Sequence, residues 1–256
     1  MGIGAEVSQY GRSWFKRLEN KILGLNDLHT YHRVRPLIRH LSEWLPAGVT
    51  EVVEFGCGDG INAFELAKAR PNLSYTGYEL NERSVQRAQG TQKQFFPTRN
   101  LAFHLTDVTR QSTVENQYEC VLLMDIVEHI EDDKAFAAWI TRSLKSGGVL
   151  AVSVPTHRYS KVFGQWFHRR VGHVRPGYTL EELTALFSGL ELTRAWYNTG
   201  SLAQIGCAMY YKYGRPVRIG LVRSLMTQIS SLVFRWFDPL NGPDRSCSIF
   251  AVFTKR

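Results

Sequence analysis

The 256-residue chain has the composition of an ordinary globular protein, with 44% hydrophobic and 21% charged residues. This length can bury a full core and fits one large domain, with or without insertions. The formal net charge is +8, but 23 acidic residues are interspersed and no long basic block occurs, so nucleic acid is allowed as a partner without being indicated. An anionic membrane surface, a phosphorylated substrate or solubility alone would account for the same excess of charge.

The sequence also shows no sign of secretion or of a membrane span. No apolar run follows a basic start, and no apolar stretch reaches about 18 residues. The four cysteines stand far apart and lack the Cys-x-x-Cys spacing of metal and redox sites. We therefore expect reduced, unligated thiols and a cytoplasmic location.

Two helices are predicted before the first strand. Apolar residues at helical spacing, interleaved with basic ones, favour a helix over residues 7–24. A second helix is predicted over residues 30–45, with Pro36 near its start, and ends before a Pro-Ala-Gly break. We expect residues 1–47 to form a helical cap beside the functional site.

From residue 51 onward, predicted strands and helices alternate, which indicates a parallel sheet covered by helices on both faces. The expected strands are 51–55, 73–79, 101–105, 118–124, 148–154, 190–197 and 247–255, and the expected helices are 60–69, 81–89, 131–145 and 179–188.

The most informative segment runs from Val52 to Gly60, where a β-branched strand leads into a glycine-dense turn that opens a helix. Gly56, Gly58 and Gly60 can adopt positive φ and have no Cβ, so a ligand can lie against bare backbone. Glu79 ends the next predicted strand about 20 residues later, the spacing expected of a carboxylate that binds ribose hydroxyls. Together the two segments predict a nucleoside site.

The glycine spacing distinguishes between two kinds of nucleoside cofactor. A dinucleotide site needs Gly-x-Gly-x-x-Gly with a pyrophosphate at the helix N-terminus, and Asp59 would repel that pyrophosphate. An acidic residue in this turn suits a cofactor with an ammonium group and a sulfonium. The turn therefore favours S-adenosylmethionine.

Four segments in order resemble the motifs of class I S-adenosylmethionine-dependent methyltransferases, and the resemblance extends over roughly residues 48–190. They are Glu54–Gly60, Tyr78–Glu79, Thr106–Val108 and Cys120–His129. The resemblance implies a Rossmann-like, seven-stranded, mostly parallel α/β sheet with an antiparallel final strand, within a methyltransferase domain over residues 48–256. It also implies that the methionine moiety contacts Glu54 and the glycine turn, the ribose contacts Glu79, and the adenine borders Asp107 and Val108. The full set of implied cofactor residues is Glu54, Phe55, Gly56, Cys57, Gly58, Asp59, Gly60, Glu79, Leu80, Asp107, Val108, Met124, Asp125 and Ile126.

Residues 198–246 form a connection of nearly fifty residues before the final strand, which is too long for a passive loop. We expect a helical insertion that covers the substrate. Within it, residues 215–237 have the pattern of a basic amphipathic helix that could lie on a membrane surface or pack on its own domain.

Asp125, Glu128 and His129 follow a strand end at spacings i, i+3 and i+4, which would place them on one helical face as a base or as metal ligands. This arrangement is similar to the Glu-x-x-Glu-His segment of ubiquinone-pathway O-methyltransferases and of small-RNA 2′-O-methyltransferases, which bind a divalent metal there. His173 resembles the residue that supplies a further ligand or faces substrate. The resemblance implies Mg²⁺, Mn²⁺ or Zn²⁺ bound by Asp125, Glu128, His129 and His173. Alternatively, the Glu-His pair orders the loop without a metal, as in metal-free relatives.

His129, His173 and His157 are the predicted catalytic residues. His129 is a candidate proton acceptor, because transfer to a hydroxyl must remove a proton. His157 and its neighbour Arg158 follow Pro155 at another strand end, where they could meet an acidic substrate group or belong to a solvated loop.

The aromatic residues expected near the pocket favour methylation of an apolar or aromatic hydroxyl compound, such as a quinone precursor, a natural product or a lipid-linked intermediate. Two alternatives remain. One is RNA methylation, supported by the positive charge and opposed by the lack of a recognisable RNA-binding module. The other is a cofactor-binding protein without turnover. The sequence does not indicate an oligomeric state.

Overall fold

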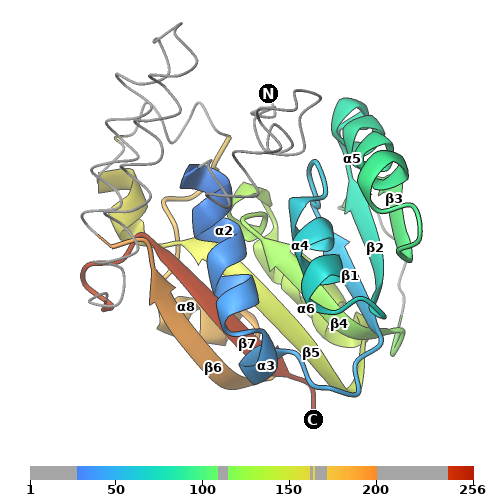
Figure 1. Ribbon diagram of the computed structural model, residues 1–256. Coiled ribbons are helices and arrows are strands. Elements are labelled where there is room, and N and C mark those ends of the chain that lie inside the picture. Colours follow the sequence, from blue (N-terminus) through green and yellow to red (C-terminus); the bar gives the residue numbers. More distant parts are fainter. Residues whose placement is uncertain (1–27, 109–114, 162–163, 165–171, 201–241) are drawn as a thin grey trace, which may run out of the picture.

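A computed structural model describes residues 28–108, 115–161, 164, 172–200 and 242–256 (Figure 1). Seven strands form one sheet in the order β3-β2-β1-β4-β5-β7-β6. Strands β1 to β5 pair in parallel, and β7 runs antiparallel to both of its neighbours, β5 and β6. The expected Rossmann-like topology is therefore confirmed. The strands are β1 (Glu51–Phe55), β2 (Ser74–Glu79), β3 (Leu101–Leu105), β4 (Tyr118–Met124), β5 (Leu144–Pro155), β6 (Glu191–Asn198) and β7 (Ser248–Thr254).

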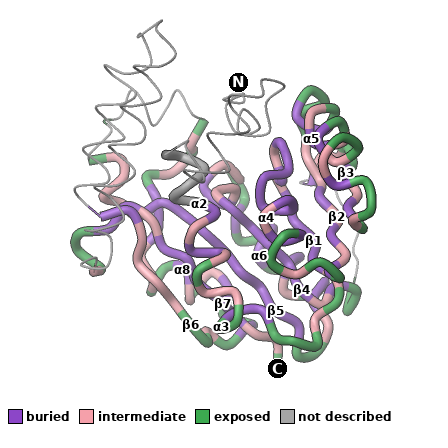
Figure 2. The backbone as a smooth tube through the Cα atoms, viewed as in Figure 1, coloured by how far each residue is buried: buried purple, intermediate pink, exposed green. Residues whose placement is uncertain are grey.

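Helices cover both faces of the sheet, in a three-layer arrangement (Figure 1). One face carries α2 (Leu28–Arg39), α3 (Leu41–Trp44), α4 (Ile61–Ala69) and α5 (Glu82–Phe95), and the other carries α6 (Asp133–Ser143) and α8 (Leu180–Leu186). Neighbouring strand residues point to opposite faces, so Val52 packs in the first core and Val53 in the second. Figure 2 shows that the central strands are buried along most of their length, whereas the edge strand β6 is more exposed.

The structure corrects three predicted boundaries. The helix predicted over residues 30–45 is two helices that meet at His40, and Pro36 lies inside α2. Strand β5 begins at Leu144, earlier than predicted, because the glycines after the helix lie within an irregular part of the ladder with β4. Helix α5 continues through Gly90 to Phe95, six residues beyond the predicted end at residue 89. The side chains of Gln89 and Gln92 donate to backbone carbonyls of β3, so tertiary contacts extend this helix past its glycine.

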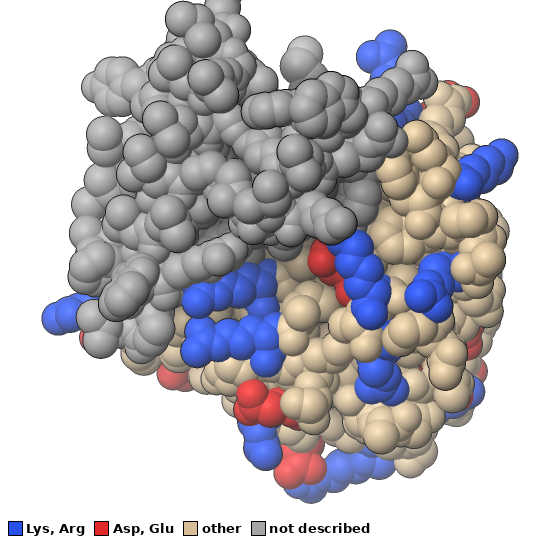
Figure 3. Space-filling model, in the orientation of Figure 1, with Lys and Arg blue, Asp and Glu red and all other residues tan. Residues whose placement is uncertain are grey.

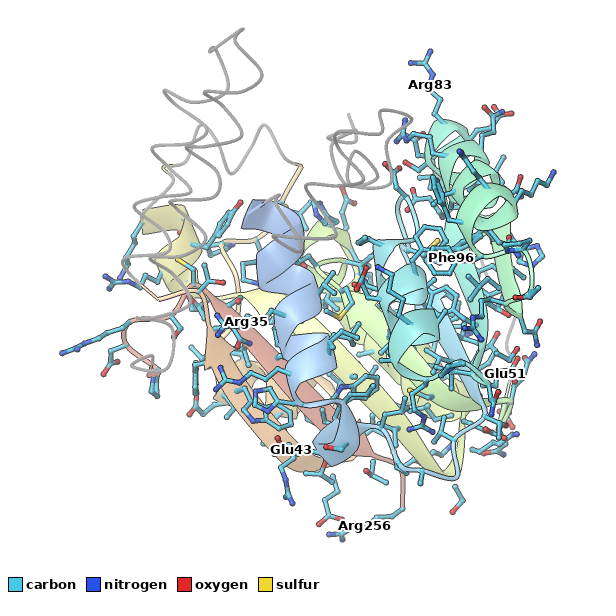
Figure 4. All side chains as sticks on the ribbon, viewed as in Figure 1. Arg35, Glu43, Glu51, Arg83, Phe96 and Arg256 are labelled. Carbon is cyan, nitrogen blue, oxygen red and sulfur yellow. The ribbon has the colours of Figure 1, made fainter. Side chains whose placement is uncertain are left out.

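Aromatic contacts hold the helices on the first face. His40 stacks on Trp196 of β6 with ring centroids 4.3 Å apart, and Trp44 packs edge-on against Phe250 of β7. Phe96, at the end of α5, stacks on Phe64 of α4 at 5.0 Å, whereas Arg83 extends away from the first turn of α5 (Figure 4). The junction of α2 and α3 and helix α3 are thereby fixed over β6 and β7, and α5 is fixed beside α4.

The ends of the predicted insertion meet at the carboxyl edge of β5. Asn198 pairs with Ser248, and the Cys247 amide donates to the Thr199 carbonyl at 3.0 Å. The helices predicted over residues 7–24 and 215–237 lie outside the described residues, so the helical cap and the substrate cover stay predictions. Among the helices that the structure describes, none is both long and apolar enough to cross a membrane.

Gly77 provides a test of packing at the centre of this fold. A Cβ at Gly77 would lie 2.6 Å from Cys57 Sγ and 3.1 Å from Phe103 Cδ1. We expect Gly77→Ala to lower the free energy of unfolding by about 1–3 kcal/mol in urea titrations, because the added methyl overpacks a buried strand. Gly90→Ala is the matched control, because Gly90 lies within helix α5 and a Cβ there would meet nothing within 4 Å. This control should raise stability by about 0.5–1 kcal/mol. Equal effects of the two substitutions would contradict the packing at Gly77.

Candidate active site

The glycine turn connects β1 to α4 and has the backbone geometry that the sequence predicts. Gly56, Gly58 and Gly60 have φ of 77°, 54° and 81°. The amides of Gly56 and Cys57 donate to the Tyr78 carbonyl at 2.8 and 3.1 Å, which ties the turn to the end of β2. A Cβ on Gly56 would overlap Cδ1 of Ile126, the flexible end of a side chain in the loop after β4, and the φ of 77° is the stronger reason for glycine at this position.

Glu79 lies directly beside this turn. Its Oε2 accepts a hydrogen bond from the Gly58 amide at 2.9 Å, and its Oε1 accepts one from the Asn81 amide at 2.8 Å. Two backbone donors thus orient the carboxylate, whose oxygens have further lone pairs for ligand hydroxyls. Leu80 follows with 69% of its surface exposed, as expected of an apolar side chain that could cover a flat ring. The predicted ribose carboxylate and the glycine turn are therefore brought together.

The two other acidic residues of this region point into the protein. Glu54 is 1% exposed, and it accepts hydrogen bonds from Asn62 of α4 at 2.7 Å and from the Tyr75 hydroxyl. Burial, followed by the charge of Glu54, raises the pKa of Tyr75 well above its ordinary value, so the hydroxyl stays a donor. Burial, and then Glu54 and Glu79, likewise raise the pKa of the Cys57 thiol.

Asp59 is 3% exposed and forms a two-pronged ion pair with Arg87 of α5, at 2.6 and 3.0 Å. The sequence interpretation assigned the Asp59 charge to the ammonium of a cofactor. In the structure this charge is directed at the Arg87 guanidinium, so its geometry supports a role in fixing the turn to α5.

The remaining predicted cofactor residues border the same edge of the sheet. Phe55 and Met124 are buried at the ends of β1 and β4, and Val108 is buried beyond β3, next to a half-buried Asp107. Asp125 has a φ of 54°, which is unusual for a residue with a side chain. Its amide donates to the Ser153 carbonyl at 2.9 Å, and the Ser153 hydroxyl donates to its Oδ1 at 3.0 Å.

Glu128, His129 and His173 form a second cluster, with one ligand atom from each lying within 4.8 Å of the other two. The rings of His129 and His173 meet edge to face at 4.7 Å, and His173 Nε2 lies 3.9 Å from Glu128 Oε1. The Glu128 and His173 side chains are buried, at 1% and 8% exposure. His129 Nδ1 lies 3.0 Å from the Gly172 carbonyl oxygen.

The expectation that Asp125, Glu128 and His129 share one helical face is wrong. Residues Val127–His129 form a single 3-10 turn, η3, and the left-handed backbone of Asp125 interrupts any α-helix before it. The three-residue cluster among the described residues accordingly excludes Asp125, whose carboxylate accepts from Ser153.

His157 lies apart from this cluster. Its Nε2 is 2.8 Å from Glu182 Oε2. The Thr179 amide, and after it His157, lower the pKa of Glu182, which belongs to the capping box of α8. His157 is therefore engaged in a surface hydrogen bond with a helix terminus.

Sequence reasoning missed Arg87, Ser153 and Arg175, which hold site residues in place. Arg175 binds Asp133 at 2.6 Å and two carbonyls that follow His129. Their partners are distant in sequence, so no local pattern reveals these contacts.

Comparison with known proteins agrees with this geometry. The methyltransferase domain family matches residues 27–200, more than half of the chain. The chain is 25% identical to the 2-methyl-6-phytyl-1,4-hydroquinone methyltransferase of Synechocystis sp. over 62% of this chain and 54% of that protein. It is 27% identical to the ubiquinone biosynthesis O-methyltransferase of Methylococcus capsulatus over 50% of this chain and 53% of that protein.

The chain thus spans about half the length of these curated relatives. Among solved structures, a putative sarcosine dimethylglycine methyltransferase from Galdieria sulphuraria has the same fold, with a TM-score of 0.64 and 15% identity over 88% of this chain and 86% of that one. The family match, the sheet order and the glycine turn beside Glu79 agree, and the chain belongs to the methyltransferase domain family, within the class I S-adenosylmethionine-dependent methyltransferases.

Proposed function

We propose that this chain transfers a methyl group from S-adenosylmethionine to a hydroxyl of a small apolar or aromatic acceptor, such as a quinone precursor, a natural product or a lipid-linked intermediate. The observation that carries the proposal is the orientation of His129, which follows β4 at the same sheet edge as the glycine turn. Two relatives whose names specify a hydroquinone substrate and ubiquinone biosynthesis support this acceptor class.

The site has two parts: a donor half, which is the glycine turn with Glu79 and Leu80 and would bind the methyl donor, and a base half, which is His129 with the loops that hold it. The shape and the hydrogen-bonding groups of the donor half suit the cofactor. The positive-φ glycines leave bare backbone at the end of β1, Glu79 offers carboxylate lone pairs, and Leu80 is an exposed apolar neighbour. We assign the methionine part to the glycine turn, the ribose to Glu79, and the adenine to Leu80, Asp107 and Val108. S-adenosylmethionine, when bound, supplies an electrophilic methyl group on a sulfonium.

His129 serves as the proton acceptor in this proposal. A carbonyl oxygen only accepts hydrogen bonds, so the neutral ring donates Nδ1–H to Gly172 and retains a lone pair on Nε2. With the cofactor bound, that nitrogen would take the proton of the acceptor's hydroxyl, and the acceptor's oxygen would replace sulfur on the methyl carbon, which releases S-adenosylhomocysteine. The imidazolium then keeps its Nδ1–H bond to Gly172, so the ring need not turn during proton transfer.

The second cluster also supports a metal-assisted version of the same reaction. A carboxylate and two imidazoles within 4.8 Å suit a divalent ion such as Zn²⁺, Mn²⁺ or Mg²⁺, with imidazole favouring transition metals. Glu128, His129 and His173 would hold it, and it would lower the pKa of a bound hydroxyl. His129 Nε2 would then be a ligand, so the two versions are mutually exclusive.

The RNA alternative is less well supported by the described surface. On the face drawn in Figure 3, Lys and Arg side chains occur in separate groups with acidic side chains beside some of them. Salt-sensitive RNA binding would favour this alternative. Peripheral membrane contact through residues 215–237 concerns a segment outside the described residues and stays a prediction.

Cofactor binding is tested by calorimetric titration with S-adenosylhomocysteine. Glu79→Gln should weaken binding by about 10-fold or more, because an uncharged amide is a poorer acceptor for two ribose hydroxyls. The amide oxygen can still accept from the Gly58 amide, although the bond from the Asn81 amide is lost, and the bonds of Gly56 and Cys57 to Tyr78 should preserve the turn. Glu82→Gln, an exposed position three residues later, is the matched control and should bind as tightly as the native chain. Equal affinities in all three proteins would remove the ribose assignment.

The role of His129 is tested with a panel of hydroxylated aromatic and prenylated compounds, measuring release of S-adenosylhomocysteine. His129→Gln should slow transfer by about 100-fold or more and leave cofactor affinity unchanged. His157→Gln should retain most activity, because the native ring is held by Glu182. If the protein binds the cofactor but methylates no compound of the panel, the result would instead favour the alternative of a cofactor-binding protein that catalyses no reaction.

Metal dependence is tested by titrating the EDTA-treated protein with Zn²⁺ or Mn²⁺ in a calorimeter. If the cluster holds a metal, Glu128→Gln should weaken metal binding by about 10- to 100-fold, because the buried carboxylate supplies the only negative charge of the three donors. Asp125→Asn should bind as the native chain does, since Asp125 lies outside the cluster. Full transfer activity in EDTA, together with no metal uptake, would exclude the metal-assisted version and retain the version in which His129 is the proton acceptor.

A further inference from the structure

Two loops meet beneath His129. One follows β4 and contains η3, and the other precedes α8 and includes Gly172. The Val174 amide donates to the Glu128 carbonyl at 3.0 Å, and His129 Nδ1 contacts the Gly172 carbonyl. Gly177 brings the second loop against β5, where a Cβ would lie 2.5 Å from the Pro155 carbonyl oxygen. The loop that orients His129 is therefore packed between the ends of β4 and β5.

Arg175 attaches this loop on the other side of His129. The Nη2 atom of Arg175 donates to the carbonyls of Ile130 and Glu131, both at 2.9 Å. The Nη1 atom lies 2.6 Å from Asp133 Oδ2, at the start of α6. One guanidinium thus bridges three groups within the four residues that follow His129.

Tyr178 completes the network. Its hydroxyl donates to Asp133 Oδ2 at 2.8 Å, and the Arg175 guanidinium lies 5.8 Å from its ring centroid. Burial, and then the hydrogen bond to Asp133, raise the pKa of Tyr178, so the hydroxyl remains a donor. Asp133 is 8% exposed, whereas the Arg175 side chain is 27% exposed, so water shields this ion pair only in part.

We propose that Arg175 is a positioning residue that selects the tautomer of His129. Arg175 attaches the loop before α8 to residues 130–133, and the Val174 amide attaches the same loop to residue 128. Together the two attachments hold the Gly172 carbonyl against Nδ1 of His129. With Nδ1–H donating to Gly172, the lone pair that remains on the neutral ring is the one on Nε2. This inference deepens the proposed function, because it rests on His129 acting through Nε2.

The guanidinium is the group that this role requires. Its planar fork presents donors in fixed directions, so it can serve two carbonyls and a carboxylate at once. A lysine ammonium could pair with Asp133 as a point charge, but it would not hold both carbonyls in the same geometry. Arg175→Lys therefore separates the charge of Arg175 from its geometry.

The test is nuclear magnetic resonance of the full chain labelled with ¹⁵N in its histidine rings, kept in EDTA at a pH where imidazole is neutral. Long-range correlations between ring protons and nitrogens report which nitrogen carries the proton, and the His129→Gln spectrum assigns His129. The native chain should show the Nδ1–H tautomer. Arg175→Ala should lose this pattern and give a mixture of tautomers, and Arg175→Lys should fail to restore it fully.

Arg194→Ala is the matched control, because Arg194 lies on the edge strand β6 and donates to the Thr193 carbonyl. Its spectrum should match the native one. Should Arg175→Ala fail to fold in a urea titration, Arg175→Lys and Asp133→Asn carry the test, since both keep polar groups at the network. An unchanged Nδ1–H pattern in the folded Arg175 variants would overturn the proposal.

A parallel titration with S-adenosylhomocysteine separates this inference from the proposed function. Affinity should stay within about threefold of native in the Arg175 variants, because Arg175 contacts Ile130, Glu131 and Asp133, none of which is assigned to the cofactor. Once an acceptor is found, kcat should fall about 10-fold without a change in the KM for the cofactor. Failure of the native chain to bind the cofactor would count against the proposed function, while the tautomer pattern would still decide the role of Arg175.

Discussion

The contact between Gly56 and Ile126 is the constraint on which the candidate site depends. It joins the turn after β1 to the loop after β4, because a Cβ on Gly56 would overlap Cδ1 of Ile126. The proposed cofactor surface belongs to the first segment, and His129 follows the second. Both segments continue from strands that pair directly, as far as Phe55 of β1 and Leu123 of β4. The distance between the donor half and the base half is thereby set by the sheet itself.

Asp125 makes this contact possible. Its left-handed backbone turns the chain sharply at the end of β4, which costs of order 1–3 kcal/mol for a residue with a side chain. Two hydrogen bonds offset part of that cost: the Asp125 amide donates to the Ser153 carbonyl, and the Ser153 hydroxyl donates to the Asp125 carboxylate. The turn delivers Ile126 to Gly56 and starts η3, which presents Glu128 and His129. The left-handed turn at Asp125 therefore causes both the backbone strain there and the position of His129 in the site.

Local patterns predicted the fold well, because its strands are short apolar runs bounded by glycine and proline. The ranges of β1, β3 and β4 match the structure to the residue. The position of Glu79 beside Gly58 also followed from spacing, since parallel neighbouring strands end at one edge. What the sequence could not show were tertiary partners. Arg87 redirects Asp59, and Ser153 stabilises a backbone conformation that a helical pattern at residues 125–129 cannot anticipate.

Backbone and side-chain bonds both hold each half of the site. In the donor half, the amides of Gly56 and Cys57 bind the Tyr78 carbonyl, and Asp59 pairs with Arg87. In the base half, the Val174 amide binds the Glu128 carbonyl, and Arg175 and Tyr178 bind Asp133.

A bond between two backbone groups needs no particular side chain, so the bonds of Gly56 and Cys57 to the Tyr78 carbonyl do not depend on the side chain at residue 78. Side-chain bonds are lost one residue at a time, and surface loops tolerate such changes better than the strands that they connect. A domain built in this way can keep the proposed donor site at the ends of β1 and β2 while the loops after β4 and before α8, which carry the proposed base, change.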